Sequence, residues 1–253
     1  MKINISKLIR KQKDDYIFNL LGIDNFNKKT SHLRHLYQFI IKQGKNLEGD
    51  IFEFGCYRGR TLLALGILLK KLSINKNIYA FDTFKGFPSY HKYDSHRYLK
   101  YRKDVYFKHC VTKKLRQFVL KSKIDKKNIS TSLDFTNNIK KELLRKIKFL
   151  KLDNLKLIEG RFSQTVPKFI KNYHGKIFCV NMDSDLYESY KVVLPLIYTK
   201  LIKKGYIHLD EYYSLKFPGC KIACDDFANK NNIKIQKNKN YVWEFERYYI
   251  KKK

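Results

Sequence analysis

Short apolar runs alternate with longer amphipathic stretches along most of the chain. Strands are predicted by the apolar runs at residues 50–54, 77–82, 155–162, 175–183 and 205–213. Amphipathic stretches predict one helix from about Thr61 and another over residues 188–203. A strand, a tight turn, a helix and a second strand form a βαβ unit, which requires a parallel sheet covered by helices. We therefore predict an α/β fold, to which residues 240–250 add an edge strand.

Two stretches depart from this alternation. Residues 1–47 are expected to be helical, because the apolar positions in LRHLYQFIIKQ recur with a helical period. Residues 90–150 are rich in Lys and Tyr and show no clear strand, so we expect a helical insert that could act as a lid. The sequence contains no internal repeat and no low-complexity linker. We therefore predict one domain over residues 1–253.

Length and composition limit the class of protein. A chain of 253 residues and 30.4 kDa can bury one sizeable core. The longest uncharged apolar stretch, residues 62–69, is far shorter than the roughly 18 residues of a membrane span. The N-terminus mixes charges without an apolar segment, which does not fit a secretory signal. Five scattered cysteines without a CxxC pair favour reduced thiols, so we expect a cytoplasmic protein.

The net charge of +31 first suggests nucleic-acid binding. The basic residues are spread along the whole chain, however, and only ten of the 54 are Arg. Arg is the residue that usually makes bidentate contacts to phosphates and bases, whereas Lys is common on any solvated surface. We therefore do not favour nucleic acid as a partner, and keep an RNA-directed enzyme as the alternative.

A glycine turn joins the first predicted strand to the following helix. Gly55 and Gly59 allow the backbone to turn sharply beneath a ligand at a helix N-terminus. Asp82 ends the next strand, near the position where dinucleotide folds place the acid that binds ribose hydroxyls. The GxGxxG fingerprint is absent, and Tyr57 would obstruct a pyrophosphate. The turn suits a nucleoside ligand without a diphosphate, although a purely structural turn would give the same pattern.

The stretch VNMDSDLYESYKVV places two acids, Asp183 and Asp185, directly after an apolar run that predicts a buried strand. One acid is enough to cap the helix expected from Glu188. Secondary structure alone therefore leaves the other acid unexplained.

Five blocks of the sequence occur in the order and spacing of one known family: GDIFEFGCYRGRTLLAL, YAFDTFKGFP, LIEGRFSQTVP, DSDLYESYKVVLPLIYTKLIKKGYIHLDEYYS and PGCKIACDDF. The chain resembles the macrocin-O-methyltransferase (TylF-like) family of S-adenosylmethionine-dependent sugar O-methyltransferases. The resemblance covers about residues 30–228, and residues 90–150 match least. It implies a Rossmann-like methyltransferase fold, with a mostly parallel sheet, helices on both faces and a helical insert.

The resemblance also implies a set of site residues. S-adenosylmethionine would lie over the turn at residues 55–59, with Asp82 at its ribose and residues 160–163 beside its adenine. In this family the acid at the position of Asp183 looks like a magnesium ligand, and Asp210 and Glu211 would supply the remaining carboxylates. The cofactor-binding residues carried over in this way are Glu53, Gly55, Tyr57, Arg58, Gly59, Asp82, Thr83, Gly160, Phe162 and Ser163.

Elementary chemistry agrees with a metal site. Asp183 and Asp210 both end predicted strands, and neighbouring parallel strands would bring them to the same edge of the sheet. Converging carboxylates repel one another unless a cation lies between them, and hard oxygen ligands suit Mg²⁺. Asp183 could then remove the proton from a sugar hydroxyl as the methyl group is transferred. Asp185 is expected to cap the following helix or to support the metal ligands.

Two positions depart from the family pattern. The family usually has Asp-Asp where this chain has Asp210-Glu211, which lengthens one ligand by a methylene, and Gln164 replaces a common acid. We predict that His208 is a core histidine and not a base. The predicted function is methyl transfer to a sugar hydroxyl of a glycan or glycosylated metabolite, and the acidic residues argue against a non-catalytic nucleotide-binding fold. The sequence leaves the acceptor and the oligomeric state open, a homo-oligomer included.

Overall fold

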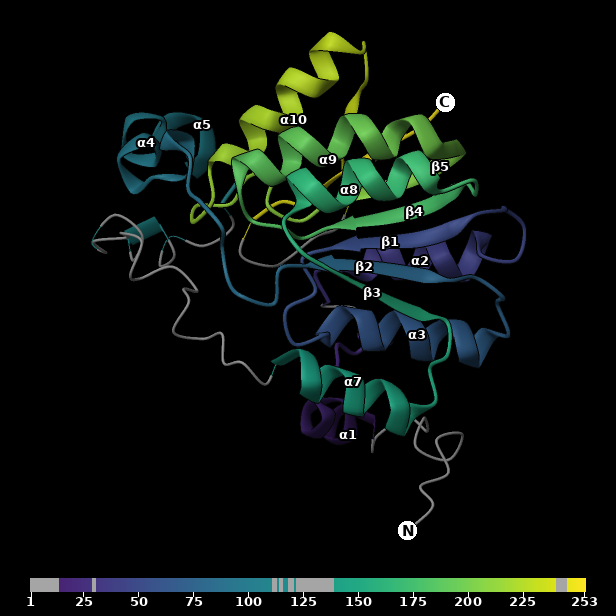
Figure 1. Ribbon diagram of the computed structural model, residues 1–253. Helices are drawn as coiled ribbons and strands as arrows, with labels where there is room; N and C mark the ends of the chain where they lie inside the picture. The colour runs from purple at the N-terminus through teal and green to yellow at the C-terminus, as the bar shows by residue number, and fades with distance from the viewer. Residues whose placement is uncertain are drawn as a thin grey trace.

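A seven-stranded sheet forms the centre of the computed structural model (Figure 1), which describes residues 14–28, 31–110, 113, 116–117, 121, 139–239 and 245–253. The strand order is β3-β2-β1-β4-β5-β7-β6, with β7 antiparallel to both of its neighbours and the other pairs parallel. The strands are β1 (Asp50–Phe54), β2 (Ile78–Asp82), β3 (Leu155–Glu159), β4 (Ile177–Met182), β5 (Leu201–Leu209), β6 (Ile235–Lys237) and β7 (Tyr248–Lys251).

Helices cover both faces of the sheet (Figure 1). One face carries α8 (Phe162–Asn172), α9 (Tyr187–Lys200) and α10 (Gly219–Lys230). The opposite face carries α2 (Arg34–Gln43) and α3 (Arg60–Leu72), and α7 (Ile139–Leu150) and α1 (Asp14–Leu21) lie beyond α3. Three short helices, η1 (Lys92–Asp94), α4 (His96–Tyr101) and α5 (Lys103–Phe107), lie past the carboxyl ends of the strands.

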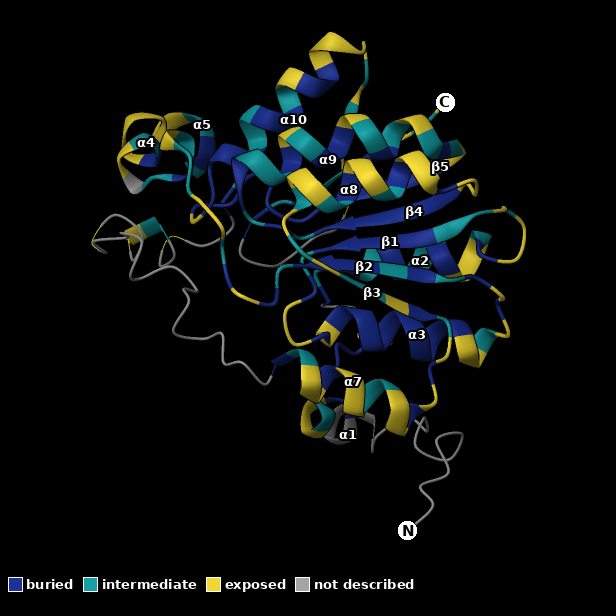
Figure 2. Ribbon diagram, viewed as in Figure 1, coloured by how far each residue is buried: buried dark blue, intermediate teal, exposed yellow. Residues whose placement is uncertain are grey.

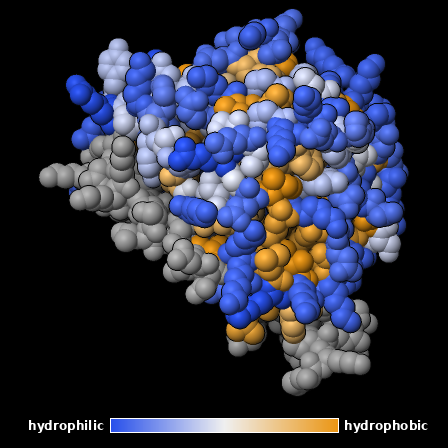
Figure 3. All heavy atoms as spheres, viewed as in Figure 1, coloured by the Kyte–Doolittle hydropathy of each residue, from blue (hydrophilic) through white to orange (hydrophobic). Residues whose placement is uncertain are grey.

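The central strands are buried on both faces (Figure 2). Phe52 and Phe54 of β1 contribute to the core beneath α8 and α9, whereas Ile51 contributes to the core beneath α2 and α3. A strand with helices on both of its faces has no solvent-facing side, which explains why these segments read as continuous apolar runs. Hydrophilic side chains cover most of the face in Figure 3 without gathering in one patch, and apolar side chains are visible near β2 and β3.

The predicted α/β fold is confirmed, and the differences lie at element boundaries. Strand β1 has the predicted bounds, but β3 ends three residues early because Gly160, with φ of 140°, turns the chain into α8. Helix α9 passes directly into β5, which therefore begins at Leu201 and ends at Leu209. The strand predicted over residues 240–250 is present in part as β7, but its predicted position at the edge is wrong, because β7 pairs with both β5 and β6; residues 240–244 lie outside the described residues. The position at the edge belongs to β6.

The segment predicted to be an insert packs into both cores at its two ends. Leu99 and Tyr106 are buried beneath α10, and Ile139 and Leu143 are buried against α3. Most of the chain between residues 111 and 138 lies outside the described residues, so a lid remains a prediction. The helical prediction for residues 1–47 agrees with α1 and α2; residues 1–13 and 29–30 are not among those described.

The strand order determines where a ligand can bind. The chain runs outward from β1 through β2 to β3, and then returns to β4 on the other side of β1. In open α/β sheets, ligands bind outside the carboxyl ends of the strands at the point where this reversal occurs. In this molecule that point lies between β1 and β4, where the glycine turn after β1 meets the acids after β4.

Gly59 ends this turn and should be sensitive to substitution. Its φ of 75° is left-handed, and a Cβ would lie 2.2 Å from Cδ1 of Leu143 in α7. We expect Gly59→Ala to lower the free energy of unfolding by about 1–2 kcal/mol in urea titrations, because left-handed backbone disfavours a Cβ. Gly66→Ala inside α3 is the control: its backbone is ordinary helix, and the gain in helix propensity offsets a contact of 3.0 Å between the new Cβ and Cδ1 of Leu152, so the net effect should be small. Equal effects of the two substitutions on the free energy of unfolding would contradict the special requirement for glycine at residue 59.

Candidate active site

The glycine turn after β1 lies directly against the backbone of the residue that follows β4. Gly55 has φ of 87°, and a Cβ at this position would lie 1.8 Å from the carbonyl oxygen of Asp183. The backbone N–H of Asp183 donates to the carbonyl of Phe54 over 3.0 Å. Glycine is therefore required at residue 55 for the approach of β4, and the contact fixes Asp183 beside the turn.

Asp82, predicted to bind ribose, holds the same turn from the side of β2. Its Oδ2 accepts hydrogen bonds from the backbone N–H groups of Cys56 and Tyr57 over 2.9 and 2.8 Å. Its Oδ1 accepts from Phe84 N–H over 2.8 Å. A carboxylate has about four lone-pair sites, so these bonds leave Asp82 with capacity for a ligand.

A cavity of about 670 Å³ opens over this turn at the carboxyl ends of β1, β2 and β4. Gly59 and Gly160 do not line it: Gly59 contacts Leu143, and a Cβ at Gly160 would meet Thr165 at 2.6 Å. These two glycines shape the backbone beside the cavity. The predicted cofactor residues that do line it are Glu53, Gly55, Tyr57, Arg58, Asp82, Thr83, Phe162 and Ser163.

Two buried polar atoms at this cavity have no hydrogen-bond partner among the described residues. Oε1 of Glu53 accepts from Asn181 over 3.1 Å, whereas Oε2 has no partner. The hydroxyl of Ser184 is also buried and unpartnered. Burial raises the pKa of Glu53 well above its ordinary value, and nearby Asp183 adds to this effect. Buried polar atoms are usually satisfied, so this side of the cavity is suited to a polar ligand.

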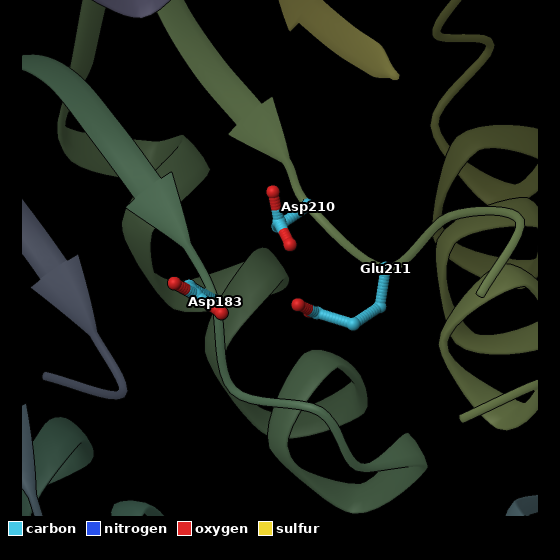
Figure 4. A group of neighbouring side chains, drawn as sticks. All are labelled: Asp183, Asp210 and Glu211. Atoms are coloured by element: carbon cyan, nitrogen blue, oxygen red, sulfur yellow. The ribbon is translucent and has the colours of Figure 1, made fainter. Parts of the chain in front are cut away.

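Three carboxylates converge beside the cavity (Figure 4). Asp183 follows β4, and Asp210 and Glu211 follow the neighbouring parallel strand β5. One oxygen from each residue lies within 4.8 Å of the others. The structure therefore brings together the acids that the sequence analysis singled out, and such a set of hard oxygen ligands fits Mg²⁺.

Asp210 lies beside three basic side chains, one from the strand that it follows and two from distant parts of the chain. Its Oδ1 lies 3.0 Å from Nε of Arg247 and 3.3 Å from Nε2 of His208, and His32 lies 4.0 Å away. Burial by itself would raise the pKa of Asp210, but the Arg247 guanidinium and His208 hold it well below its ordinary value. His208 is fully buried, as predicted for a core histidine, and orients this carboxylate.

Glu211 and Asp183 have the opposite electrostatic environment. Oε2 of Glu211 accepts from the Tyr190 hydroxyl over 2.5 Å and from Asp185 N–H over 3.4 Å. Burial and the neighbouring Asp210 raise the pKa of Glu211 well above its ordinary value. The same two causes raise the pKa of Asp183 to about 7. Without a cation, the cluster therefore combines one ionised carboxylate with two that retain protons near neutral pH.

Of the two roles predicted for Asp185, the helix cap is wrong, and support of the metal ligands remains a prediction. The N–H of Tyr187, at the start of α9, donates to Oδ1 of Asp94 over 2.9 Å, and Asp94 comes from η1. Asp185 adopts a left-handed backbone with φ of 61° and lines the cavity. The second acid of VNMDSDLYESYKVV therefore lies at the cavity, and an acid from the predicted insert, Asp94, caps the helix.

Several residues of the site were missed from the sequence. Arg247 had a visible signal, since it is a charged residue immediately before an apolar strand. His32 and Asp94 gave none, because each comes from an element that is remote in the sequence, and Tyr190, although close to Asp183, looks like an ordinary core residue of a helix. The missed residues are His32, Asp94, Tyr190 and Arg247.

Solved structures that are similar to this chain include three methyltransferases, and the similarity shows that this chain shares their fold. Calicheamicin methyltransferase CalS11 is 19% identical with a TM-score of 0.64, covering 98% of this chain and 82% of that chain. The O-methyltransferase NovP is 21% identical with a TM-score of 0.62, over 87% and 78% of the two chains. An O-methyltransferase from Bacillus cereus in complex with SAH is 9% identical with a TM-score of 0.58, over 98% and 94%.

The chain belongs to the macrocin-O-methyltransferase (TylF) family, whose sequence profile matches residues 26–126 and 117–242. The match includes residues 90–150, which were expected to agree least. Demethyldecarbamoylnovobiocin O-methyltransferase from Streptomyces niveus is 25% identical over 207 residues, 81% of this chain and 67% of that protein. The predicted family is confirmed, and the protein is an S-adenosylmethionine-dependent O-methyltransferase. Among the described helices, none has the length and apolar character needed to cross a membrane.

The raised pKa of Asp183 has a consequence for stability. In the unfolded chain an Asp loses its proton near pH 4, whereas in the folded, cation-free protein Asp183 keeps it to about pH 7. Folding therefore binds a proton in this window, and the free energy of unfolding should fall as pH rises from about 4 to 7. Asp183→Asn cannot ionise and should flatten this slope in urea titrations with EDTA. Asp226→Asn, at an exposed residue, is the control. If the free energy of unfolding of Asp183→Asn depends on pH as steeply as that of the wild type, the raised pKa of Asp183 is contradicted.

Proposed function

We propose that this enzyme transfers the methyl group of S-adenosylmethionine to a sugar hydroxyl, with Mg²⁺ held by Asp183, Asp210 and Glu211. The observation that carries this proposal is the contact between Gly55 and Asp183, because it joins the cofactor turn to the carboxylate cluster. S-adenosylmethionine bound over the turn and a sugar hydroxyl bound at the carboxylate cluster would therefore meet at Asp183.

Names of similar proteins support a sugar acceptor. The relative from Streptomyces niveus is described as acting on demethyldecarbamoylnovobiocin. The apo structure of CalS11 is described as a TDP-rhamnose 3′-O-methyltransferase, and it is 19% identical with a TM-score of 0.52. By analogy, we propose that the acceptor of this chain is a deoxysugar, either carried by a nucleotide or attached to a small molecule.

The residues that line the cavity have separate tasks in binding the cofactor. Oε2 of Glu53 is an unpartnered acceptor that would bind the cofactor's ammonium group. Asp82 would add a ribose hydroxyl to the backbone groups it already holds, and Phe162 and Ser163 would lie beside the base. Arg58 lines the same cavity with its positive charge available to a carboxylate.

Methyl transfer forms a bond from the acceptor oxygen to the methyl carbon as the carbon–sulfur bond breaks. The hydroxyl proton must leave in the same process, and Asp183 is the proposed acceptor of that proton. Bound Mg²⁺ would lower the pKa of a coordinated hydroxyl, so that a carboxylate could deprotonate it. Arg247 and His208 would keep Asp210 ionised and oriented for the cation.

Cofactor binding should depend on Asp82. We expect Asp82→Ala to weaken S-adenosylmethionine binding by about 1–3 kcal/mol, because it removes both the ribose acceptor and the bonds that hold the turn. Asp82→Asn keeps one acceptor oxygen and should fall between wild type and Asp82→Ala. Isothermal titration calorimetry measures these affinities, with the exposed substitution Asp153→Asn as the control. Absence of cofactor binding by the wild type would overturn the assignment of the cavity.

Methyl transfer should require the carboxylate cluster and a divalent ion. The assay is formation of S-adenosylhomocysteine with TDP-rhamnose and with a rhamnosyl glycoside, in EDTA and with Mg²⁺ restored. Asp183→Asn should be the most damaging substitution, because it removes a ligand charge and the proposed base. Asp210→Asn should be partly rescued by excess Mg²⁺, and Asp226→Asn should resemble wild type. Full activity in EDTA would rule out the metal mechanism and leave the methyltransferase assignment intact.

A further inference from the structure

Residues 91–110 contact the two elements that hold Glu211 and Asp210 in place: the start of α9 and the residues before β7. This segment contains η1, α4 and α5, and Leu99 and Tyr106 anchor it in the core. The Tyr106 hydroxyl donates to the carbonyl of Pro218, immediately before α10. The segment is therefore fixed to the body of the enzyme at the edge of the sheet where the site lies.

The first contact leads to Glu211 through α9. Asp94 is 2% exposed, and its Oδ1 accepts the Tyr187 N–H that begins α9. Three residues further along this helix, the Tyr190 hydroxyl donates to Glu211. Gly219 provides the room for this cap, since a Cβ there would lie 2.3 Å from Oδ1 of Asp94. An N-cap fixes the first turn of a helix, and here that turn carries the hydroxyl that holds Glu211.

The second contact leads to Asp210 through the residues before β7. Nδ1 of His109 lies 2.8 Å from Oε2 of Glu246, and the N–H of Glu246 donates to the His109 carbonyl over 3.1 Å. The His109 ring is stacked on Tyr213 with centroids 3.8 Å apart. The next residue after Glu246 is Arg247, whose Nε–H donates a hydrogen bond to Oδ1 of Asp210. Main-chain and side-chain bonds thus tie the segment to the short stretch that supplies the guanidinium.

Asp183 is held without the segment. Its backbone bonds to Phe54, and Gly55 packs against its carbonyl, so β1 and β4 alone fix it. The backbone N–H of Asp210 likewise donates to the Met182 carbonyl over 3.0 Å, but the Asp210 carboxylate is oriented by Arg247 and the Glu211 carboxylate by Tyr190. Mutual repulsion would push them apart, and the two contacts from residues 91–110 oppose this movement.

We infer that residues 91–110 preorganise the cation site, with Asp94 positioning Glu211 and His109 positioning Asp210. This inference rests on the proposed function, in which those carboxylates hold the cation. Residues that orient metal ligands typically change metal affinity by 10- to 100-fold, and these two act one step further away. We therefore expect each alanine substitution to weaken cation binding by about three- to tenfold.

The test is Mn²⁺ binding measured by electron paramagnetic resonance, without acceptor or cofactor. Asp94→Ala and His109→Ala should bind Mn²⁺ more weakly than wild type, while calorimetric affinity for S-adenosylmethionine is unchanged. Asp94→Asn keeps an oxygen for the Tyr187 N–H, and His109→Asn keeps an N–H for Glu246, so both should recover most of the affinity. Tyr101→Ser, at an exposed side chain of α4, is the control within the same segment.

The outcomes distinguish the inference from the function on which it rests. Failure of the wild type to bind Mn²⁺ would overturn the proposed cation site itself. Normal Mn²⁺ binding by wild type and by both alanine variants would overturn only the positioning role. Equal losses of Mn²⁺ and cofactor affinity would also overturn it, because they would indicate a general disturbance of the sheet edge. If Asp94→Ala does not fold, Asp94→Asn and the His109 variants still decide the question.

Discussion

Repulsion between three carboxylates at the ends of two neighbouring strands is the constraint around which this site is built. Asp183, Asp210 and Glu211 lie close enough to share one cation; Asp210 and Glu211 are buried, and Asp183 is half-buried at the cavity. The protein compensates them unequally. Asp210 receives a buried guanidinium and an imidazole, whereas the donors to Glu211 among the described residues are neutral, the Tyr190 hydroxyl and a backbone N–H. The cluster is therefore incompletely neutralised, which favours a divalent ion over a structural ion pair.

The same constraint connects the two halves of the active site. Gly55 has no side chain because the carbonyl of Asp183 occupies that space, and Asp82 holds the N–H groups of the next two residues. The turn that would carry the methyl donor and the acid that would deprotonate the acceptor therefore share one rigid contact. Displacement of either by an ångström would affect both, which is important because methyl transfer depends strongly on alignment.

Much of the fold and the core of the site could be predicted because their signals are local. Strand β1, the glycine turn and the strand ends at Asp183 and Asp210 are each defined by a few adjacent residues, and parallel pairing brings the acids together. The sequence did not reveal what stabilises them. Arg247 reaches Asp210, and Asp94 reaches Tyr187, across separations that no periodic pattern encodes. The error about Asp185 arose for this reason: a nearby acid looked sufficient to cap α9.

The antiparallel insertion of β7 between β5 and β6 also bears on how the enzyme is made. Arg247, 3% exposed, is synthesised 37 residues after Asp210, and the strand that follows it is the last of the sheet in chain order. On the ribosome, β1 to β5 can assemble while the acids at their ends still lack this counter-charge. The finished sheet cannot bury an ionised Asp210 until β7 pairs with β5. The pairing of β7 with β5 therefore adds a strand to the sheet and, through the residue that precedes it, supplies the charge beside Asp210.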